Sequence, residues 1–241
     1  MKIKVLKPGS ICHGVVCFTF DDARYRQWLP LMETFAAFHA HATFFFHGEI
    51  DAEAIKAMRQ LQQFDHSVGL HSVSHADADT GFAEIGAEAY FAGEIAPQLE
   101  ACRQAGIEVR NFAYPNNRHT AETDRFLMAR GGFRRFRCGL AANPPKGFAI
   151  AAQPDAFLPL DAIKNAAVLG GCGIGEYYAT TQENLNAALT HCAETNTLLT
   201  LFSHGISETP GMVDMHTHTL EQCLAEAARQ GIAMAGFDEL P

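Results

Sequence analysis

The sequence predicts an α/β fold with mainly parallel strands, and three observations lead to this prediction. Apolar, strand-like runs alternate with helix-like segments along the whole chain, which is the pattern of successive βα units. Several of these runs end in Asp, His or Pro, and polar groups at strand ends are typical of the active face of a β/α barrel. The chain has 241 residues, close to the ~250 residues of a one-domain barrel. We therefore expect a single catalytic domain over residues 1–241.

The expected elements follow from hydrophobic periodicity and from stop signals. Strands are predicted at residues 15–20, 41–46, 67–71, 109–114, 133–138, 197–203 and 232–236. Helices are predicted at residues 27–39, 52–64, 85–104, 121–130, 182–195 and 220–230. Residues 139–175 contain four prolines and are expected to be irregular. The glycine cluster at 170–175 lacks the Lys of a phosphate-binding loop, so we interpret it as a flexible surface or lid loop.

The composition limits the classes of partner. The formal net charge is −9, which argues against nucleic acid or an anionic membrane surface, because phosphate contacts need clustered Lys and Arg. Apolar residues make up 48 % of the chain, enough for a large core. No apolar run is long enough to span a bilayer.

The cysteines and the N-terminus bear on the compartment. Seven cysteines are scattered without a Cys-x-x-Cys pair, so a disulfide framework and a Cys-type zinc site are not expected. Residues 1–8 carry charge but no apolar stretch of signal-peptide length. We therefore expect a cytoplasmic protein.

Two short motifs carry the chemistry. The first strand ends in Asp21 and Asp22, and about fifty residues later His71 and His75 stand four apart. Taken separately, the two carboxylates are typical of a helix N-terminus, and the two histidines are typical of a surface. Taken together, they offer one Asp and two His to a divalent metal, with one carboxylate to spare. Three protein ligands are typical of a catalytic zinc with an open position.

Two later strands make the pattern specific. Residues 111–117 read as a strand that ends in Pro115 and polar turn residues, and residues 198–205 read as a strand that ends in His204. With these four motifs in this order, the chain resembles the polysaccharide deacetylase family, also called the NodB-homology family or carbohydrate esterase family 4. The resemblance covers residues 15–239 and implies a deformed (β/α) barrel with seven mainly parallel strands.

The resemblance also implies roles for individual residues. Asp22, His71 and His75 would bind one divalent metal, for which we expect Zn²⁺, although other divalent ions suit the same ligands. Asp21 would be the general base, and His204 the general acid that protonates the departing amine. The backbone N–H of Asn116 would stabilise the oxyanion. Residues of the substrate pocket would be Phe202, Tyr114 and Pro115.

The chain departs from the family pattern at three places. The family often has an Arg where this chain has Ala113, and Arg118 or Arg137 could replace it. The Asp-rich segment that ends in Trp is not visible, and Trp28, the only tryptophan, lies elsewhere. We expect Asp161 to be the acid that orients His204, with Asp155 as the second candidate.

The predicted function is a metal-dependent hydrolase that removes an acetyl group from an N-acetylated sugar or polysaccharide. The substrate would be a small molecule or an oligosaccharide. One alternative keeps the metal chemistry but acts on a small non-sugar amide or a cyclic imide. An alternative of another class is a non-catalytic carbohydrate-binding module on a decayed deacetylase fold, although the chain keeps both Asp21 and His204.

Overall fold

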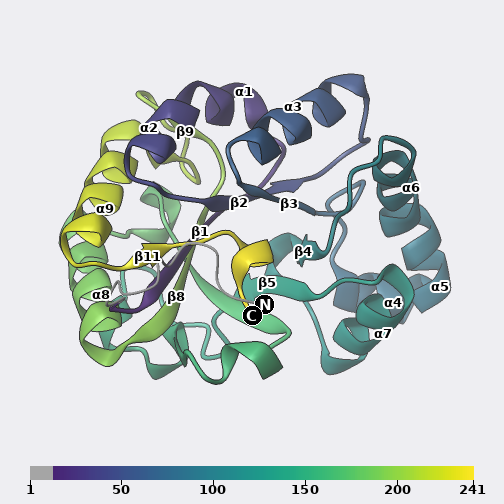
Figure 1. The fold of residues 1–241 in the computed structure, drawn as a ribbon. Coiled ribbons are helices and arrows are strands. Elements are labelled where there is room, and N and C mark those ends of the chain that lie inside the picture. The colour runs from purple at the N-terminus through teal and green to yellow at the C-terminus, as the bar shows by residue number, and fades with distance from the viewer. Residues whose placement is uncertain (1–12) are drawn as a thin grey trace.

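The structure, a computed structural model, describes residues 13–241. Within them, seven parallel strands close into a barrel with helices around it (Figure 1). These strands are β1 (Val15–Phe20), β2 (Ala42–Phe46), β3 (Ser67–Leu70), β4 (Asn111–Ala113), β5 (Arg135–Gly139), β7 (Val168–Gly173) and β8 (Thr197–Ser203). Each strand pairs with the next in this order, and β1 pairs with β8 to close the ring. The predicted seven-stranded barrel is confirmed.

Four further strands are short. They are β6 (Phe157–Pro159), antiparallel to β8; β11 (Ala233–Met234), which extends the sheet beside β1; and the separate pair β9 (Ile206–Ser207) and β10 (Met215–His216). All of these elements lie on or around the one barrel. That residues 1–241 form a single domain stays a prediction.

The helices form the outer layer (Figure 1). They are α1 (Tyr25–Trp28), α2 (Met32–Ala37), α3 (Ala52–Gln63), α4 (Ala78–Ile85), α5 (Ala87–Tyr90), α6 (Ala96–Gln104), α7 (Ala121–Gly131), α8 (Gln182–Thr195) and α9 (Thr217–Arg229). The helix expected at 27–39 is divided into α1, a 3-10 turn and α2, because Pro30 in that turn has no N–H to donate. The helix expected at 85–104 begins at Ala87, contains a π-turn at Phe91–Ile95 and is preceded by α4, which the sequence reading missed.

Alternation along β1 sets the direction of its side chains, because successive residues of a strand point to opposite faces. Val15 and Cys17 belong to the smaller apolar cluster inside the barrel, whereas Val16, Phe18 and Phe20 belong to the large cluster beneath the helices. The same alternation directs Asp21, the residue after the strand, towards the inside of the barrel mouth.

The glycine cluster predicted to be a surface loop is instead the barrel strand β7. A side chain at Gly171 would place its Cβ 3.1 Å from the Phe202 ring, and one at Gly173 would overlap the Tyr178 ring. The glycines therefore allow two aromatic rings to pack against the strand, and the prediction of a lid loop was wrong.

His66 lies in the core beside β2. It is 4 % exposed, accepts a hydrogen bond from the Ala42 N–H at 3.0 Å and packs edge-on against Phe35 and Phe44. Burial lowers the pKa of His66 to about 3, so this imidazole is neutral near pH 7.

Candidate active site

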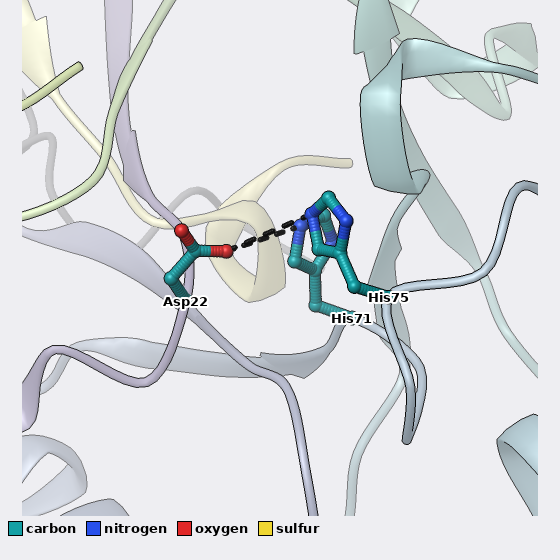
Figure 2. A group of neighbouring side chains, drawn as sticks. All are labelled: Asp22, His71 and His75. Carbon is teal, nitrogen blue, oxygen red and sulfur yellow. Dashed lines mark ion pairs between the residues drawn. The ribbon is translucent and has the colours of Figure 1, made fainter. Parts of the chain in front are cut away.

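Three residues that follow barrel strands converge at the carboxyl ends of those strands. Asp22 follows β1, and His71 and His75 lie on the loop after β3. Asp22 Oδ1 lies 3.7 Å from His71 Nε2 and 3.8 Å from His75 Nε2. Figure 2 shows the carboxylate pointing towards the two imidazole rings. The three ligand atoms all lie within 4.8 Å of one another.

The backbone at or beside these three residues adopts the left-handed conformation. Asp22 and His75 have φ values of 71° and 61°, and Ser72, beside His71, has 64°. Non-glycine residues rarely adopt this left-handed region, which costs free energy and is most common at functional sites.

Hydrogen bonding fixes the form of His71. Its Nδ1 lies 2.8 Å from the Ala113 carbonyl oxygen, to which it donates, so Nε2 keeps its lone pair towards Asp22. Burial lowers the pKa of His71 to about 3. The ring is therefore a neutral imidazole, the form that binds a metal.

The donor set fits a divalent metal. The Asp22 Oδ1 atom is buried and has no hydrogen-bond partner among the described residues. Its distances to the two Nε2 atoms are too long for direct hydrogen bonds. One carboxylate oxygen and two imidazole nitrogens that face a common point are the ligands that zinc and similar ions prefer.

Asp21 is buried beside this cluster and is paired with an arginine. Its side chain is 3 % exposed, and its Oδ2 accepts a hydrogen bond from the Arg137 guanidinium. The Arg137 guanidinium also donates to Asn117 Oδ1 and lies 4.5 Å from the centre of the Phe202 ring. Burial lowers the pKa of Arg137 to about 10, so the guanidinium is still charged near neutral pH.

The arginine missing from the fourth strand is supplied by its neighbour. Ala113, where the family often has Arg, pairs in register with Arg137 on β5. Of the two candidates left open, Arg137 therefore reaches Asp21. Arg118 instead pairs with Asp79 at 3.0 Å.

His204 follows β8 on the other side of Asp22. Its Nε2 lies 3.9 Å from Asp22 Oδ2, and its Nδ1 donates to the Val213 carbonyl oxygen at 3.1 Å. Burial lowers the pKa of His204, while the nearby Asp22 carboxylate acts in the opposite direction.

The prediction that Asp161 orients His204 was wrong. Asp161 is exposed and follows β6, whose Pro159 pairs with Thr197 at the beginning of β8. His204 follows the last residue of β8, so the two lie at opposite ends of that strand. The second candidate, Asp155, accepts a hydrogen bond from the Ala142 N–H. A backbone carbonyl, that of Val213, takes the orienting position instead.

Trp28 is a site residue that the sequence reading missed. It is fully buried, and its indole N–H donates to the His204 carbonyl oxygen at 2.7 Å. Because Trp28 and His204 are far apart in the sequence, no local pattern could have joined them.

The residues around the Pro motif divide between the core and the site. Tyr114 is fully buried, donates its hydroxyl hydrogen to Asp124 and stacks on Phe136, and Pro115 is also buried. Neither Tyr114 nor Pro115 lines the cavity of about 380 Å³ described below, and their place in a substrate pocket stays a prediction. Asn116 has a φ of 51°, and its side-chain amide donates to Asp77 at 2.7 Å.

A cavity of about 380 Å³ adjoins the carboxyl ends of β5, β7 and β8, and both Asn116 and Phe202 line it. Tyr178, another residue that the sequence reading missed, packs edge-on against Phe202 with ring centres 5.2 Å apart. Burial raises the pKa of Tyr178 to about 12, so its phenol is neutral. A larger hollow, of about 590 Å³, lies on the outside between α2 and α9 and contains none of these residues.

Three further polar residues follow barrel strands or precede the outer helices. The ring of His47 lies edge-on to that of His75, with centres 6.0 Å apart. Asp77 precedes α4 without a side-chain capping bond. His216 caps α9 by accepting a hydrogen bond from the His218 N–H.

The sequence profile described as polysaccharide deacetylase matches residues 11–134. The chain belongs to the polysaccharide deacetylase family. No curated protein matches it. Among the residues that the structure describes, no helix is long and apolar enough to cross a membrane.

Solved structures of family members share the fold. A Streptococcus mutans CE4 esterase is 22 % identical over 93 % of this chain and 86 % of its own, with a TM-score of 0.58. A family 4 carbohydrate esterase from Streptomyces lividans, in complex with acetate, is 16 % identical over 95 % of each chain, with a TM-score of 0.61. A CE4 family pseudoenzyme from Bacillus anthracis is 16 % identical over 98 % of this chain and 69 % of its own, with a TM-score of 0.60.

Proposed function

We propose that this chain is a metal-dependent hydrolase that removes an acetyl group from an N-acetylated sugar or polysaccharide. One observation carries the proposal. The three ligand atoms of Asp22, His71 and His75 lie within 4.8 Å of one another. The buried Asp21 carboxylate lies 4.0 Å from His71 Nε2, and His204 Nε2 lies 3.9 Å from Asp22 Oδ2. This arrangement supports a metal site with a base and an acid beside it.

Asp22, His71 and His75 would hold the ion, and zinc suits the three ligands best. When bound, a divalent ion would polarise the amide carbonyl and lower the pKa of water. Asp21 would accept the proton of the attacking water, held in position for this by Arg137.

His204 would supply the proton that the departing nitrogen needs. An amine is a poor leaving group until it is protonated, so amide hydrolysis requires a general acid. With Nδ1 held by Val213, the His204 Nε2 is the atom that would carry and transfer that proton. The backbone N–H of Asn116 would contribute to stabilising the oxyanion.

A non-catalytic binding module is the rival hypothesis, and one solved relative is described as a pseudoenzyme. A binding module would not need a general base or a general acid, so it could lose either residue without losing its function. In this chain, both Asp21 and His204 are present, and Asp21 has a buried arginine partner. These features favour an enzyme.

The test compares acetate release by wild type and Asp21→Asn on a panel of N-acetyl sugars, with simple amides and cyclic imides alongside. Asp21→Asn should keep its metal but lose about two to four orders of magnitude in rate, the usual contribution of a general base. Asp161→Asn, at an exposed position away from the site, is the matched control and should behave as wild type. No turnover of any compound by metal-loaded wild type would favour the binding module.

A further inference from the structure

The 380 Å³ cavity shares two lining residues with the group of side chains around Asp21, the proposed base. Asn117 and Phe202 line it, and these same two side chains contact the guanidinium of Arg137, which in turn binds Asp21. A molecule in the cavity would therefore lie one side chain away from the catalytic carboxylate. The volume is near the lower end of the range for small-molecule sites, about 300–1,000 Å³.

One wall of the cavity is a loop tied down at several points. The Gly147 N–H donates to the Tyr178 carbonyl oxygen at 2.8 Å, and the Lys146 ammonium lies 3.4 Å from the centre of the Tyr177 ring. The Asn184 side chain on α8 donates to the Phe148 carbonyl oxygen at 2.6 Å. Because the loop is anchored to both the 176–178 turn and α8, the part of it that lines the cavity, which includes Asn143 and Phe148, is held in place.

The charged groups along the cavity are already paired. Arg118 lies 3.0 Å from Asp79, and His119 lies 3.0 Å from Asp124. Arg137, behind the wall, is paired with Asp21. An anionic ligand would have to compete with these carboxylates for each cation.

Apart from these paired groups, the described residues that line the cavity are neutral. Asn117 and Asn143 offer amide groups, and Phe148, Tyr178 and Phe202 offer aromatic surface. Aromatic faces and amide side chains suit a ring that carries hydroxyl groups, because the ring's apolar face packs on the aromatic and its hydroxyls pair with the amides.

We propose that this cavity binds a neutral N-acylated sugar of one or two rings, so that the chain acts on short soluble substrates rather than on long polysaccharide. The proposal rests on the proposed function and narrows its substrate class. It names the cavity as the part of the site that sets both the length and the charge of the substrate.

The first experiment measures kcat/KM of the metal-loaded wild type on N-acetylglucosamine, on its linear β-1,4 oligomers up to six rings, and on N-acetylglucosamine 6-phosphate. We expect kcat/KM to stop rising at one or two rings. The 6-phosphate should be at least about tenfold poorer, because the described residues that line the cavity offer it no unpaired cation. A kcat/KM that climbs with every ring up to six, or a 6-phosphate as good as the neutral sugar, would overturn the proposal.

The second experiment fills the cavity. Ala141 and Ala142 are adjacent and exposed, but only Ala141 lines the cavity. Ala141→Trp should weaken binding of N-acetylglucosamine at least about tenfold by occupying the ligand's space, and Ala142→Trp should change it less than about twofold. Binding is measured by calorimetry on metal-loaded protein that also carries Asp21→Asn, so that no turnover intervenes. Metal content and thermal unfolding should match between the two tryptophan variants.

The two proposals fail in different ways. If wild type hydrolyses N-acetyl sugars but both tryptophan variants bind N-acetylglucosamine equally well, the cavity proposal is overturned while the proposed function stands. If wild type hydrolyses nothing but Ala141→Trp alone weakens binding, the cavity is a sugar-binding site, whereas the proposed function and the claim that the chain acts on short substrates are both overturned.

Discussion

Replacing Arg137 with Gln should destabilise the chain strongly, because it leaves the Asp21 carboxylate buried without its cation. The two side chains are 1 % and 3 % exposed. Removing one partner of such a buried pair costs about 3–5 kcal/mol. For a chain of this length, 1 kcal/mol shifts Tm by about 2–4 °C, so we expect Tm to fall by roughly 6–20 °C.

Thermal unfolding of chelator-treated protein at pH 7 is the assay, since bound metal would add its own stabilisation. Arg130→Gln is the matched control. Arg130 and its partner Glu88 are 54 % and 72 % exposed, and a surface pair contributes only about 0–1 kcal/mol. The double variant Asp21→Asn with Arg137→Gln should unfold at a higher temperature than Arg137→Gln alone, because it buries no unpaired charge. An Arg137→Gln variant that unfolds within ~2 °C of Arg130→Gln would refute the reasoning about a buried pair.

Two further predictions concern histidines. His204→Ala should lower amide hydrolysis by about two to four orders of magnitude and spare an activated aryl acetate, whose leaving group needs little protonation; a parallel loss on both substrates, with normal metal content and unfolding, would remove His204 from the role of acid. The pKa of His66 is about 3 in the folded chain and about 6.5 unfolded, so the unfolded state binds more protons as the pH falls below 6.5. Between pH 7 and pH 5, wild type should therefore lose about 2 kcal/mol more unfolding free energy than His66→Asn, and equal losses in urea titrations at the two pH values would contradict this assignment.

Most of the barrel could be predicted because the local sequence pattern marks most of its strands. The strand at 15–20 and the helix at 182–195 have the predicted bounds, since apolar runs and a Thr181 cap mark them within a few residues. The strand Val168–Gly173 was missed because it is rich in glycine, which is uncommon in strands. Gly171 and Gly173 leave the space that the rings of Phe202 and Tyr178 occupy. That packing partner is set by the tertiary fold and is not visible in the local pattern.

The candidate site divides in the same way. Asp22 lies two residues after β1, and His71 and His75 lie on the loop after β3, so the carboxyl edge of a parallel barrel brings them together once the strands are known. The groups that hold the site residues in place could not be predicted from strand positions alone. Arg137 reaches Asp21 by lying beside Ala113 across a strand pair, and Val213 reaches His204 from a loop. These contacts depend on register and loop path, which a single sequence does not encode in any short motif.

The central claim is that hydrolysis depends on one ion held by Asp22, His71 and His75. The most direct measurement is reconstitution: the protein is stripped with a chelator, and acetate release from an N-acetyl sugar is followed while Zn²⁺ is added stepwise, with His75→Ala titrated in parallel. We predict that stripped wild type is inactive, that activity returns in proportion to added metal up to about one equivalent per chain, and that His75→Ala stays inactive because two protein ligands remain. Full activity in the stripped protein, or equal recovery in His75→Ala, would contradict the claim.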